Sequence, residues 1–415
     1  MNYQEAIGWL FSTQLFGIKL GLENPARLLR EFRAFPAHGV KVVHVAGTNG
    51  KGSVCAMIDA VARATGRRTG LFTSPHLVDY RERIRVSGEM IPEETCAAYL
   101  TELRSIAESM EAHPTFFELT LACGMRWFGE RECDLIVLET GMGGRYDATN
   151  AVPKDVAVIT PIGLDHQQWL GATLGEIAYQ KAGILREGVP AVCAPQPEEA
   201  RRVIEQVANE ARVSSLEFID TPLLGYELAL RGPHQKWNAA VALAALHAVK
   251  VPMFHDAVRY GLSRTSWAGR FERLAGEPAV ILDGAHNPHA AVALAQTWAE
   301  EFGTAKATLI FGAVESKDVA GVLGELAPLA RRILLVPVDS PRGLPVGALR
   351  AALSGLRAAL GGVAVAPETL ELGGVDEALA LARGFPEPVL VAGSLFLVGQ
   401  ARARLTEGEF QRSSQ

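Results

Sequence analysis

The chain has 415 residues, a length typical of two or three domains that each bury a core of their own. Apolar residues make up 48% of the sequence and charged residues 21%, so the composition is that of a folded globular protein and excludes a disordered chain or a small disulfide-stapled module. The 46 acidic and 40 basic residues leave a net charge of −6 with no long run of one sign, which argues against nucleic acid or another polyanion as the main partner.

The cysteines and the N-terminus both favour a cytoplasmic protein. Five cysteines without a Cys-x-x-Cys pair are typical of reduced thiols, and we expect their side chains to be buried and unreactive. Residues 1–17 include the acidic Glu5 and lack the basic region of a signal peptide, and no run of about 18 apolar residues could span a membrane. The sequence therefore predicts neither secretion nor a membrane partner.

Short runs of Val, Ile and Leu alternate with longer stretches of helical spacing along the chain. This alternation is typical of parallel β/α units, and runs that are apolar on successive residues suit strands covered on both faces. A change of composition over residues 264–278 predicts two domains, residues 1–268 and 269–415, and we expect the polar end at 406–415 to be frayed. The predicted strands are residues 42–46, 69–73, 135–139, 156–160, 191–194, 280–283, 308–311, 333–336 and 389–392.

The first strong motif follows the run at residues 42–46. The turn that leads from this predicted strand into a helical stretch contains Gly47, Gly50, Lys51 and Ser53. Backbone N–H groups in such a turn can hold phosphate oxygens, and the lysine and the helix N-terminus add positive potential. The spacing is a variant of the usual Gly-x-x-x-x-Gly-Lys-Ser/Thr loop, and a turn that only connects a strand to a helix is the alternative. Since the guanine-specifying Asn-Lys-x-Asp motif is absent, ATP is the expected nucleotide.

Other predicted strands end in a polar residue at the same relative place, at Ser74, Glu139, His166 and Asp283. Ligands of open α/β sheets bind at this carboxyl edge. We therefore expect Ser74, Glu139 and His166 to hold Mg²⁺ beside nucleotide phosphates through a hydroxyl, a carboxylate and an imidazole. A turn or cap role for Ser74 and His166, and a satisfied buried acid at Glu139, are the alternatives.

Lys181 lies on the apolar face of a predicted helix. Residues 173–176 (TLGE) form a capping box that starts this helix, and Leu174, Ile177, Lys181 and Ile184 then follow at spacings of 3, 4 and 3. Because burying an ammonium group without a partner costs free energy, the Lys181 side chain must reach solvent, pair with an acid or be chemically modified. Periodicity alone favours the first of these.

A second polar cluster opens the C-terminal part of the chain. Asp283, His286 and Asn287 follow the predicted strand at 280–283 and precede a helical stretch, and Arg270 lies at the predicted boundary, where it can reach either domain. Turn and cap chemistry explains such a cluster as well as a site does. Its position at a cleft between two domains favours a binding site.

These motifs together resemble those of the bacterial dihydrofolate synthase/folylpolyglutamate synthase family, relatives of the Mur ligases. The match runs through nearly the whole chain, and so many motifs in the same order argue against chance. The segments that carry the resemblance are 16–24 (FGIKLGLEN), 44–53 (HVAGTNGKGS), 73–77 (TSPHL), 83–88 (RIRVSG), 115–118 (TFFE), 139–150 (ETGMGGRYDATN), 163–166 (GLDH), 180–183 (QKAG), 269–272 (GRFE) and 283–287 (DGAHN).

The resemblance implies a fold and a set of cofactors. The fold would be α/β, with an N-terminal Mur-ligase-like ATPase domain built on a mostly parallel sheet, a smaller Rossmann-like C-terminal domain, and ATP between them. Two Mg²⁺ ions, an N-carboxylated Lys181 and, as an optional cofactor, a monovalent cation would accompany the nucleotide. Carboxylation would convert the buried cation into an anion that can face the metals. The family also implies a monomer.

The resemblance further implies roles for single residues. By position, the triphosphate would be bound by Thr48, Asn49, Gly50, Lys51, Gly52 and Ser53, and the nucleotide site completed by Asn238, Arg270 and Asp283. The metal would be held by Ser74, Glu139 and His166. The family's pteroate site falls on Thr115, Phe116, Phe117, Glu118, Tyr146, Asp147 and Ala148, although family members usually have Leu or a similar aliphatic residue at the position of Tyr146. Catalytic roles would belong to Lys51, Lys181, His166 and His286.

The activity implied is the ATP-dependent addition of L-glutamate to dihydropteroate and to the glutamate tail of reduced folates. A carboxylate is a poor electrophile, so ATP would first convert it to an acyl phosphate, with Mg²⁺ and Lys51 offsetting the charge of the transferred group. The amine of glutamate would then displace phosphate. His286, or Asp283 near it, would orient the glutamate or help its ammonium group lose a proton.

Three alternatives remain open at this point. The chain could be a folylpolyglutamate synthase without the dihydrofolate synthase activity. A Mur-type ligase acting on a UDP-muramyl substrate shares the loop and the lysine, but it usually carries an extra N-terminal domain, and about forty residues precede the loop here. A non-catalytic ATP switch would need neither the metal ligands nor Lys181.

Overall fold

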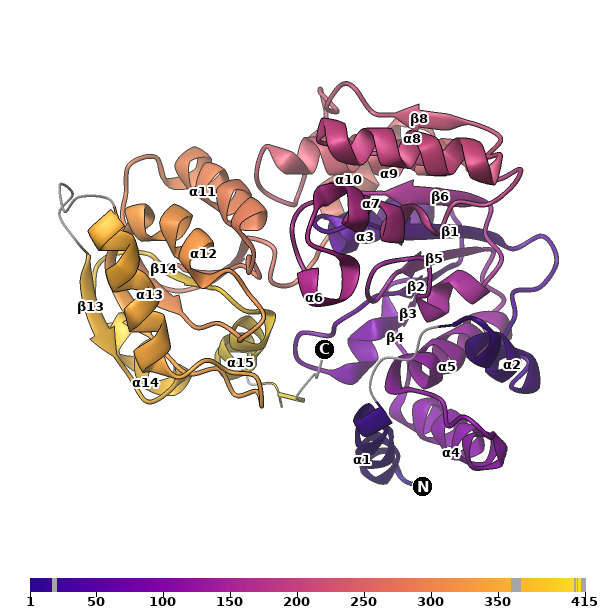
Figure 1. Ribbon diagram of the computed structural model, residues 1–415, viewed down its shortest axis with the longest axis horizontal. Coiled ribbons are helices and arrows are strands. Elements are labelled where there is room, and N and C mark those ends of the chain that lie inside the picture. The colour runs from indigo at the N-terminus through magenta and orange to yellow at the C-terminus, as the bar shows by residue number, and fades with distance from the viewer. Residues whose placement is uncertain (17–20, 360–366, 407, 409, 412–415) are drawn as a thin grey trace.

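Two α/β domains lie side by side in the computed structural model of the protein, each built around one sheet (Figure 1). The structure describes residues 1–16, 21–359, 367–406, 408, 410 and 411. Residues 17–20 of the motif at 16–24 therefore lie outside the described residues, as do several positions of the segment 406–415.

The N-terminal domain contains an eight-stranded sheet with the order β4-β3-β2-β5-β1-β6-β7-β8. The six strands from β2 to β8 in this order are parallel, whereas β3 and β4 at one edge run antiparallel. The strands are β1 (Lys41–Ala46), β2 (Thr69–Phe72), β3 (Ile84–Val86), β4 (Glu89–Met90), β5 (Leu135–Glu139), β6 (Val156–Ile159), β7 (Ala191–Cys193) and β8 (Leu216–Phe218).

The carboxyl ends of the central strands coincide, and this brings the predicted site residues together. β1 pairs with β5 so that Val45 lies opposite Glu139, and it pairs with β6 so that Ala46 lies opposite Ile159. The turn after β1, the carboxylate at the end of β5 and the segment from β6 to His166 therefore emerge at one edge of the sheet. Parallel α/β sheets bind their ligands at this edge.

Helices cover both faces of this sheet, because the strand residues are apolar on both sides. Along β6, for example, Val156 and Val158 join the core under α3, α9 and α10, whereas Ala157 and Ile159 join the core under α7 and α8. The helices are α1 (Tyr3–Ser12), α2 (Glu23–Glu31), α3 (Lys51–Ala64), α4 (Glu93–Ser109), α5 (Phe116–Glu130), α6 (Gln167–Leu170), α7 (Leu174–Ala182), α8 (Glu198–Ala211), α9 (His234–Ala248) and α10 (His255–Arg264).

The C-terminal domain contains a six-stranded sheet with the order β13-β12-β11-β14-β10-β9, in which only the edge strand β9 is antiparallel to its neighbour. Helices again cover both faces. The strands are β9 (Glu272–Leu274), β10 (Val280–Leu282), β11 (Ala307–Phe311), β12 (Ala330–Leu335), β13 (Glu368–Glu371) and β14 (Val389–Ala392), and the helices are α11 (Pro288–Phe302), α12 (Val319–Leu326), α13 (Val346–Ala359), α14 (Val375–Ala382) and α15 (Leu395–Leu405).

The α/β fold class and all the predicted strands are confirmed, with ends that differ by up to three residues. The boundary expected between residues 268 and 269 falls in the connection from α10 to β9. The expectation of a frayed end is wrong for Gln411, whose backbone N–H donates to the carbonyl of Val78 over 2.8 Å and whose side chain accepts from the N–H of Tyr80 over 2.7 Å. Gln411 thus joins the C-terminal domain to the loop that follows β2 in the N-terminal domain.

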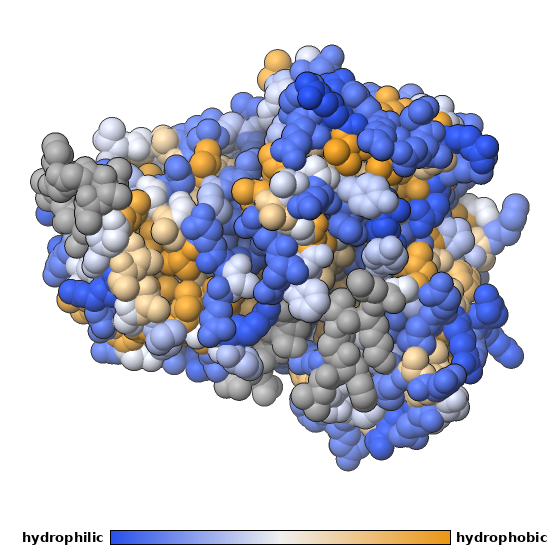
Figure 2. Space-filling view, in the orientation of Figure 1, coloured by the Kyte–Doolittle hydropathy of each residue, from blue (hydrophilic) through white to orange (hydrophobic). Residues whose placement is uncertain are grey.

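The surface and the cysteines agree with a globular chain. On the face seen in Figure 2, hydrophilic residues cover most of the N-terminal domain and leave only small apolar patches between them. Among the helices that the structure describes, none combines the length and the apolar character that a membrane span requires. The cysteines are buried free thiols, as expected: Cys55, Cys96, Cys123, Cys133 and Cys193.

Candidate active site

The loop between β1 and α3 depends on two glycines. Gly47 has a φ of 150° and Gly50 a φ of 86°, conformations that favour glycine. A Cβ atom at Gly47 would collide with the side chain of Thr160, and one at Gly50 would lie 2.8 Å from Oδ1 of Asn238. Helix α3 begins directly after Gly50, so the unpaired N–H groups of its first turn lie beside the loop, where an anion can accept hydrogen bonds from them.

Two lysines converge on the carbonyl oxygen of Gly47. Lys51 Nζ donates to it over 3.1 Å and to the carbonyl of Thr48 over 3.2 Å, and Lys181 Nζ donates to it over 2.7 Å. Lys181 is only 4% exposed, so the expectation that its side chain reaches solvent is wrong. Burial, and then the positive charge of Lys51, lower the pKa of Lys181 to about 7. A large share of the Lys181 amines is therefore uncharged at neutral pH.

Ser74, Glu139 and His166 all line one cavity, and two of them, Ser74 and Glu139, contact each other. The N–H of Ser74 donates to Glu139 Oε2 over 3.1 Å, while the buried hydroxyl of Ser74 has no hydrogen-bond partner among the described residues. Burial raises the pKa of Glu139, an effect that the charge of Lys51 opposes. Burial, and then the charge of Lys317, lower the pKa of His166 to about 3, so its ring is neutral and can act as a ligand.

This donor set fits Mg²⁺. Within the part of the chain that the structure describes, no group of three or more His, Cys, Asp and Glu side chains could hold a metal by itself. One carboxylate, one hydroxyl and one imidazole leave the other positions to water and phosphate oxygens, which is how proteins bind Mg²⁺ beside nucleotides. The orphaned hydroxyl of Ser74 is the observation that favours a cation here.

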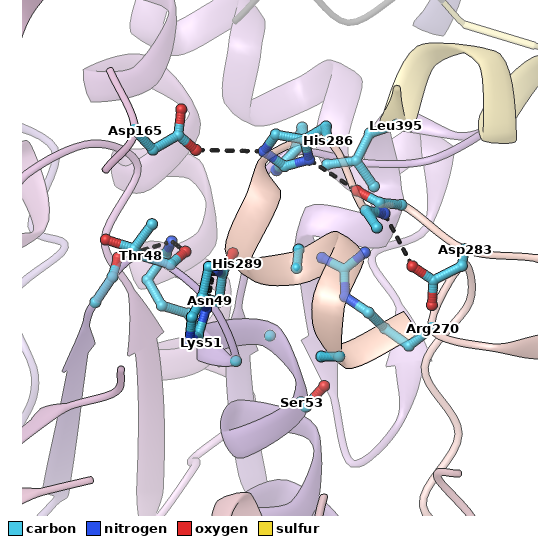
Figure 3. A pocket seen from close by; sticks show the side chains of 18 of the residues that line it. Thr48, Asn49, Lys51, Ser53, Asp165, Arg270, Asp283, His286, His289 and Leu395 are labelled. Carbon is cyan, nitrogen blue, oxygen red and sulfur yellow. Dashed lines mark hydrogen bonds and ion pairs between the residues drawn. The ribbon is translucent and has the colours of Figure 1, made fainter. Parts of the chain in front are cut away.

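A cavity of about 600 Å³ separates these residues from the C-terminal domain. In Figure 3, Lys51 and Ser53 of the N-terminal domain lie across from Arg270, Asp283 and His286 of the C-terminal domain. An inter-domain cavity with a few convergent polar groups is the common form of a small-molecule site.

Asp283 and His286 are held in place by the backbone around them. Asp283 accepts hydrogen bonds from the N–H of Phe271 over 2.8 Å and from that of Ala285 over 2.9 Å, and burial raises its pKa. His286 Nδ1 lies 2.7 Å from the carbonyl oxygen of Gly284, so this nitrogen donates to the carbonyl. The other ring nitrogen of His286 is directed toward the N-terminal domain.

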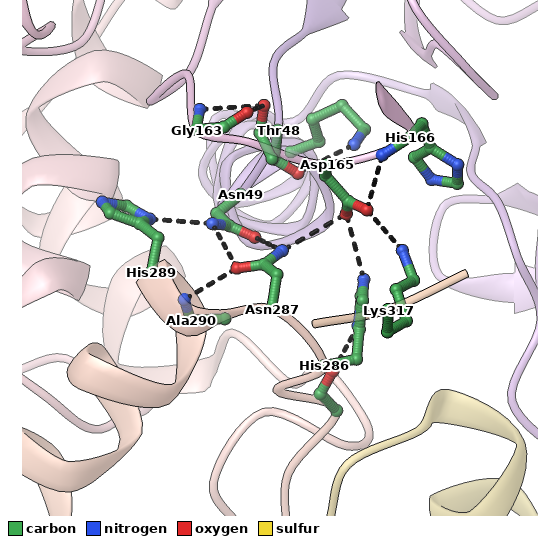
Figure 4. Close-up of polar contacts among 12 residues, drawn as sticks. Thr48, Asn49, Gly163, Asp165, His166, His286, Asn287, His289, Ala290 and Lys317 are labelled. Atoms are coloured by element: carbon green, nitrogen blue, oxygen red, sulfur yellow. Dashed lines mark hydrogen bonds and ion pairs between the residues drawn. The ribbon is translucent and has the colours of Figure 1, made fainter. Parts of the chain in front are cut away.

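Polar contacts join the two domains beside the cavity (Figure 4). Asp165 accepts a hydrogen bond from Lys317 Nζ over 2.5 Å and from Asn287 Nδ2 over 3.3 Å, and it lies 3.4 Å from His286 Nε2. Asn49 and Asn287 exchange hydrogen bonds of 3.2 and 3.0 Å. Although burial alone would raise the pKa of Asp165, the hydrogen bond from His286 and the charges of His286 and Lys317 hold it well below its usual range.

The structure brings one part of the predicted site together and leaves another part outside the cavity. The residues predicted for nucleotide, metal and catalysis that line it are Thr48, Asn49, Gly50, Lys51, Gly52, Ser53, Ser74, Glu139, His166, Lys181, Asn238, Arg270, Asp283 and His286. The residues predicted for pteroate do not line it: Thr115, Phe116, Phe117, Glu118, Tyr146, Asp147 and Ala148.

The residues predicted for pteroate lie behind or beside the cavity wall. Thr115 and Glu118 form the capping box of α5, in which the N–H of Thr115 donates to Glu118 over 2.6 Å. The ring of Phe117 lies against Gly141, which lines the cavity, at 2.8 Å from the place of a Cβ atom there. Tyr146 is 46% exposed and Asp147 is buried.

Comparison with known proteins identifies the family. The model of the Mur ligase middle domain matches residues 45–220, and that of the Mur ligase glutamate ligase domain matches residues 269–395. The dihydrofolate synthase/folylpolyglutamate synthase of Bacillus subtilis is 32% identical over 97% of this chain and 99% of its own length. The chain belongs to the dihydrofolate synthase/folylpolyglutamate synthase family.

Solved structures of such synthases have the same fold. Escherichia coli FolC in complex with DHPP and ADP matches with a TM-score of 0.86 at 32% identity. The match covers 97% of the present chain and 98% of the FolC chain. A bifunctional synthase from Yersinia pestis, complexed with AMPPNP and a Mn ion, matches with a TM-score of 0.86 at 31% identity over 98% of both chains. Another structure of a bifunctional synthase holds Mn, AMPPNP and L-glutamate, and it matches with a TM-score of 0.84 at 31% identity. The match covers 97% of the present chain and 98% of the solved one. All three structures hold a nucleotide, and the two with AMPPNP also hold Mn.

The present chain spans about half the length of some other relatives. The probable bifunctional folylpolyglutamate synthase/dihydropteroate synthase of Haloferax volcanii is 36% identical over 98% of this chain but only 51% of its own length.

Among the residues that line the site without a role predicted from the sequence, three make polar contacts between the domains. Asp165 is part of the motif at 163–166 without a predicted role, and Lys317 and His289 come from the C-terminal domain. Lys317 follows β11 by six residues, so its position beyond the carboxyl end of a parallel strand is the signal that could have found it. His289 lies in the first turn of α11, and its Nδ1 is 2.8 Å from Nδ2 of Asn49.

Proposed function

We propose that the synthase joins L-glutamate to dihydropteroate and to the glutamate tail of reduced folates, with ATP converted to ADP and phosphate. The observation that carries this proposal is the convergence of three groups in one cavity: the Gly47–Lys51 loop, the Glu139 carboxylate beside the orphaned Ser74 hydroxyl, and the cluster of Asp283 and His286. ADP, AMPPNP, DHPP and L-glutamate in the solved relatives support it.

The nucleotide site is assigned to residues on both sides of the cavity. The phosphates would accept hydrogen bonds from the N–H groups at the start of α3 and from the ammonium group of Lys51. Without nucleotide, Lys51 donates to the carbonyls of its own loop. Asp283 and Arg270, on the opposite wall, can reach the rest of the nucleotide across the cavity. The full set is Thr48, Asn49, Gly50, Lys51, Gly52, Ser53, Asn238, Arg270 and Asp283.

The metal site is assigned to Ser74, Glu139 and His166. When bound there, Mg²⁺ would reduce the negative charge on the transferring phosphoryl group. The buried Glu139 carboxylate, the free hydroxyl of Ser74 and the neutral ring of His166 supply three donors of the kinds that fit. Up to two Mg²⁺ ions and an optional monovalent cation belong to this proposal.

Carboxylation of Lys181 belongs to the proposal as well. The lone pair of an uncharged amine can attack the carbon of CO₂, form an N–C bond and release a proton to solvent, and the pKa of about 7 leaves many Lys181 amines uncharged. The carbamate would carry a negative charge toward the metal side of the cavity. It would also replace a buried cation whose one hydrogen-bond partner among the described residues is the Gly47 carbonyl.

Catalysis would proceed through an acyl phosphate. The substrate carboxylate attacks the γ-phosphorus of ATP while Lys51 lies beside the phosphates, and ADP leaves. The uncharged amine of glutamate then attacks the acyl carbon, and phosphate leaves with its bonding electrons. His286, across the cavity, would orient the glutamate or, with a neutral ring whose Nε2 has left Asp165, accept a proton from its amine.

The pteridine would lie where residues 115–118 and 146–148 meet the wall of the cavity. Phe117 supports Gly141 from behind, and Tyr146 offers an exposed ring of the kind that stacks on aromatic ligands. A monomer in the cytoplasm, where free thiols such as the five of this chain persist, completes the proposal.

The test is ADP release by the purified synthase with ATP, Mg²⁺ and glutamate. Dihydropteroate, tetrahydrofolate and a UDP-muramyl peptide are compared in parallel, and glutamate-dependent turnover with both pteridines is expected. Lys181→Ala should lower turnover about a hundredfold or more, whereas the exposed lysine variant Lys306→Ala should retain it. Turnover with one pteridine would reduce the function to that half, and turnover with the muramyl peptide alone would overturn the proposal.

A further inference from the structure

A chain of polar side chains, all buried except the partly buried Lys154, lies behind the wall of the cavity without lining it. Its members are Lys154, His44, Thr149, Asp147 and Asn150, called the Lys154 network here. His44 lies in the central strand β1 and is fully buried, and Thr149 is fully buried as well. Burying so many polar groups costs free energy unless every one has a partner, so their arrangement calls for a reason.

One arm of the network runs from Lys154 to Asp147. As an ammonium group, Lys154 Nζ has only N–H donors, and it lies 2.9 Å from Nδ1 of His44, so this nitrogen accepts and the proton of the neutral ring sits on Nε2. Nε2 lies 2.7 Å from Oγ1 of Thr149 and donates to it. The hydroxyl proton of Thr149 is then free to donate to Oδ1 of Asp147 over 2.5 Å. Each step fixes the direction of the next.

The second arm runs from Lys154 to Asn150. Lys154 Nζ donates to Oδ1 of Asn150 over 2.5 Å, which fixes the orientation of the amide. The Nδ2 group of Asn150 is then left to donate to the carbonyl of Arg145 over 3.0 Å and to that of Gly183 over 3.1 Å. An amide turned the other way would place its oxygen against both carbonyls.

Both arms end on segments that line the cavity. Oδ2 of Asp147 accepts the N–H of Met142 over 2.9 Å, and Met142 belongs to the glycine loop of the cavity wall. Gly183, held by Asn150, follows Lys181 by two residues at the end of α7. One buried amine therefore sets the positions of the loop and of the lysine helix together.

The charges keep this pattern stable. Burial, followed by the charges of Lys154 and Arg186, holds the pKa of His44 well below its usual value, so the ring is neutral at neutral pH. Burial also lowers the pKa of Lys154 well below 10.5. An uncharged Lys154 amine still has two N–H groups for the same two acceptors, Nδ1 of His44 and Oδ1 of Asn150, and the direction of the network is kept when both of them donate.

We propose that Lys154, His44 and Thr149 are positioning residues of the ligase reaction, which hold the Met142 loop and the Lys181 helix in the geometry that the pteridine substrate requires. The inference rests on the proposed function.

Thr149→Val tests the inference, because it removes the hydroxyl between His44 and Asp147 and keeps a side chain of similar shape. We expect kcat/KM for dihydropteroate to fall about tenfold, as substitutions in supporting shells do, with the KM for ATP unchanged. Thr149→Ser, which keeps the hydroxyl, should restore most of the activity. The matched control is Thr308→Val, since the Thr308 hydroxyl is equally buried and has no hydrogen-bond partner among the described residues.

An unchanged kcat/KM in Thr149→Val, an equal loss in Thr149→Ser, or the same loss in Thr308→Val would overturn the inference while leaving the proposed function intact. If the unmodified synthase released no ADP with any pteridine, the proposed function itself would fail. Nitrogen NMR of ¹⁵N-histidine protein then judges the network alone. The His44 resonances are those that change in Thr149→Val and not in Thr308→Val. A neutral ring protonated on Nε2 supports the network, and protonation on Nδ1 contradicts it.

Discussion

Lys181 is the residue at which burial and charge conflict most directly. Its amine is 4% exposed and donates to a backbone carbonyl, and its pKa falls to about 7 from an ordinary value of 10.5. Because the folded-state pKa lies below the unfolded one, the unfolded chain binds more protons between these two pH values. The lysine therefore destabilises the fold most below about pH 7, and this penalty fades as the pH rises toward 10.5.

Lys181→Met should remove this pH dependence. In buffer freed of dissolved CO₂, we expect the variant to have a larger free energy of unfolding than the unmodified synthase at neutral pH, and the difference to close as the pH approaches 10.5. Urea denaturation at several pH values measures it. A difference that stays constant with pH would show that the amine keeps an ordinary pKa in the folded state.

At the same scale, the sequence predicted single residues where each follows a strand. Gly47 and Glu139 stand directly at or after the carboxyl ends of neighbouring parallel strands, so their meeting follows from the register of one sheet. Asp283 stands directly after a strand of the other sheet, which predicts its place at the edge of that sheet. The contact of Lys317 with Asp165 could not be predicted in this way, because it depends on how the two domains dock. No local pattern in the sequence encodes that docking.

At the scale of elements, strands with apolar runs were predicted and short edge strands were not. β4 is exposed along its length and β13 is buried at none of its residues, so neither shows an apolar run. β3, β8 and β9 have only three residues each, and their pairing at or near the edge of a sheet depends on neighbours distant in the sequence. Tertiary contacts, and not local pattern, decide these strands.

The packing of the glycine loop on α7 offers a test at this scale. A Cβ atom at Gly144 would lie 2.7 Å from the carbonyl oxygen of Lys181 and 2.9 Å from the side chain of Ile184. Gly144→Ala must therefore push the loop and the helix apart, at a cost of about 1–3 kcal/mol as for other overpacked sites. We expect lower stability and slower turnover together, measured by denaturation and ADP release.

Gly129 provides the control for this substitution. It lies near the end of α5, and a Cβ atom there would meet nothing within 4 Å. Gly129→Ala should therefore stabilise the protein by about 0.5–1 kcal/mol through the greater helix propensity of alanine, with normal turnover. Equal effects of the two alanines would mean that the loop yields freely to the added methyl group.

At the scale of the whole molecule, polar contacts beside the cavity join the two domains, in addition to the packing of Leu77 and Val78 in a core of the C-terminal domain. Asp165 and Lys317 form an ion pair, with side chains 8% and 9% exposed. Asn49, in the glycine-rich loop between β1 and α3, exchanges hydrogen bonds with Asn287 at the start of α11. The loop that would bind the nucleotide therefore touches the other domain directly.

Lys317→Met should separate binding from closure, because it leaves the Asp165 carboxylate without its closest cation while the nucleotide loop keeps its residues. We expect the dissociation constant of ADP to stay within about threefold and kcat to fall about tenfold or more. The radius of gyration with bound nucleotide, measured by small-angle scattering, should exceed that of the unmodified synthase.

Arg332→Met is the matched control, since Arg332 donates to both oxygens of Glu387 over 2.8 Å entirely within the C-terminal domain. It should lower stability, as broken buried pairs do, without opening the molecule. If both variants gave the same scattering and the same kcat, the Asp165–Lys317 pair would stabilise the fold without controlling closure.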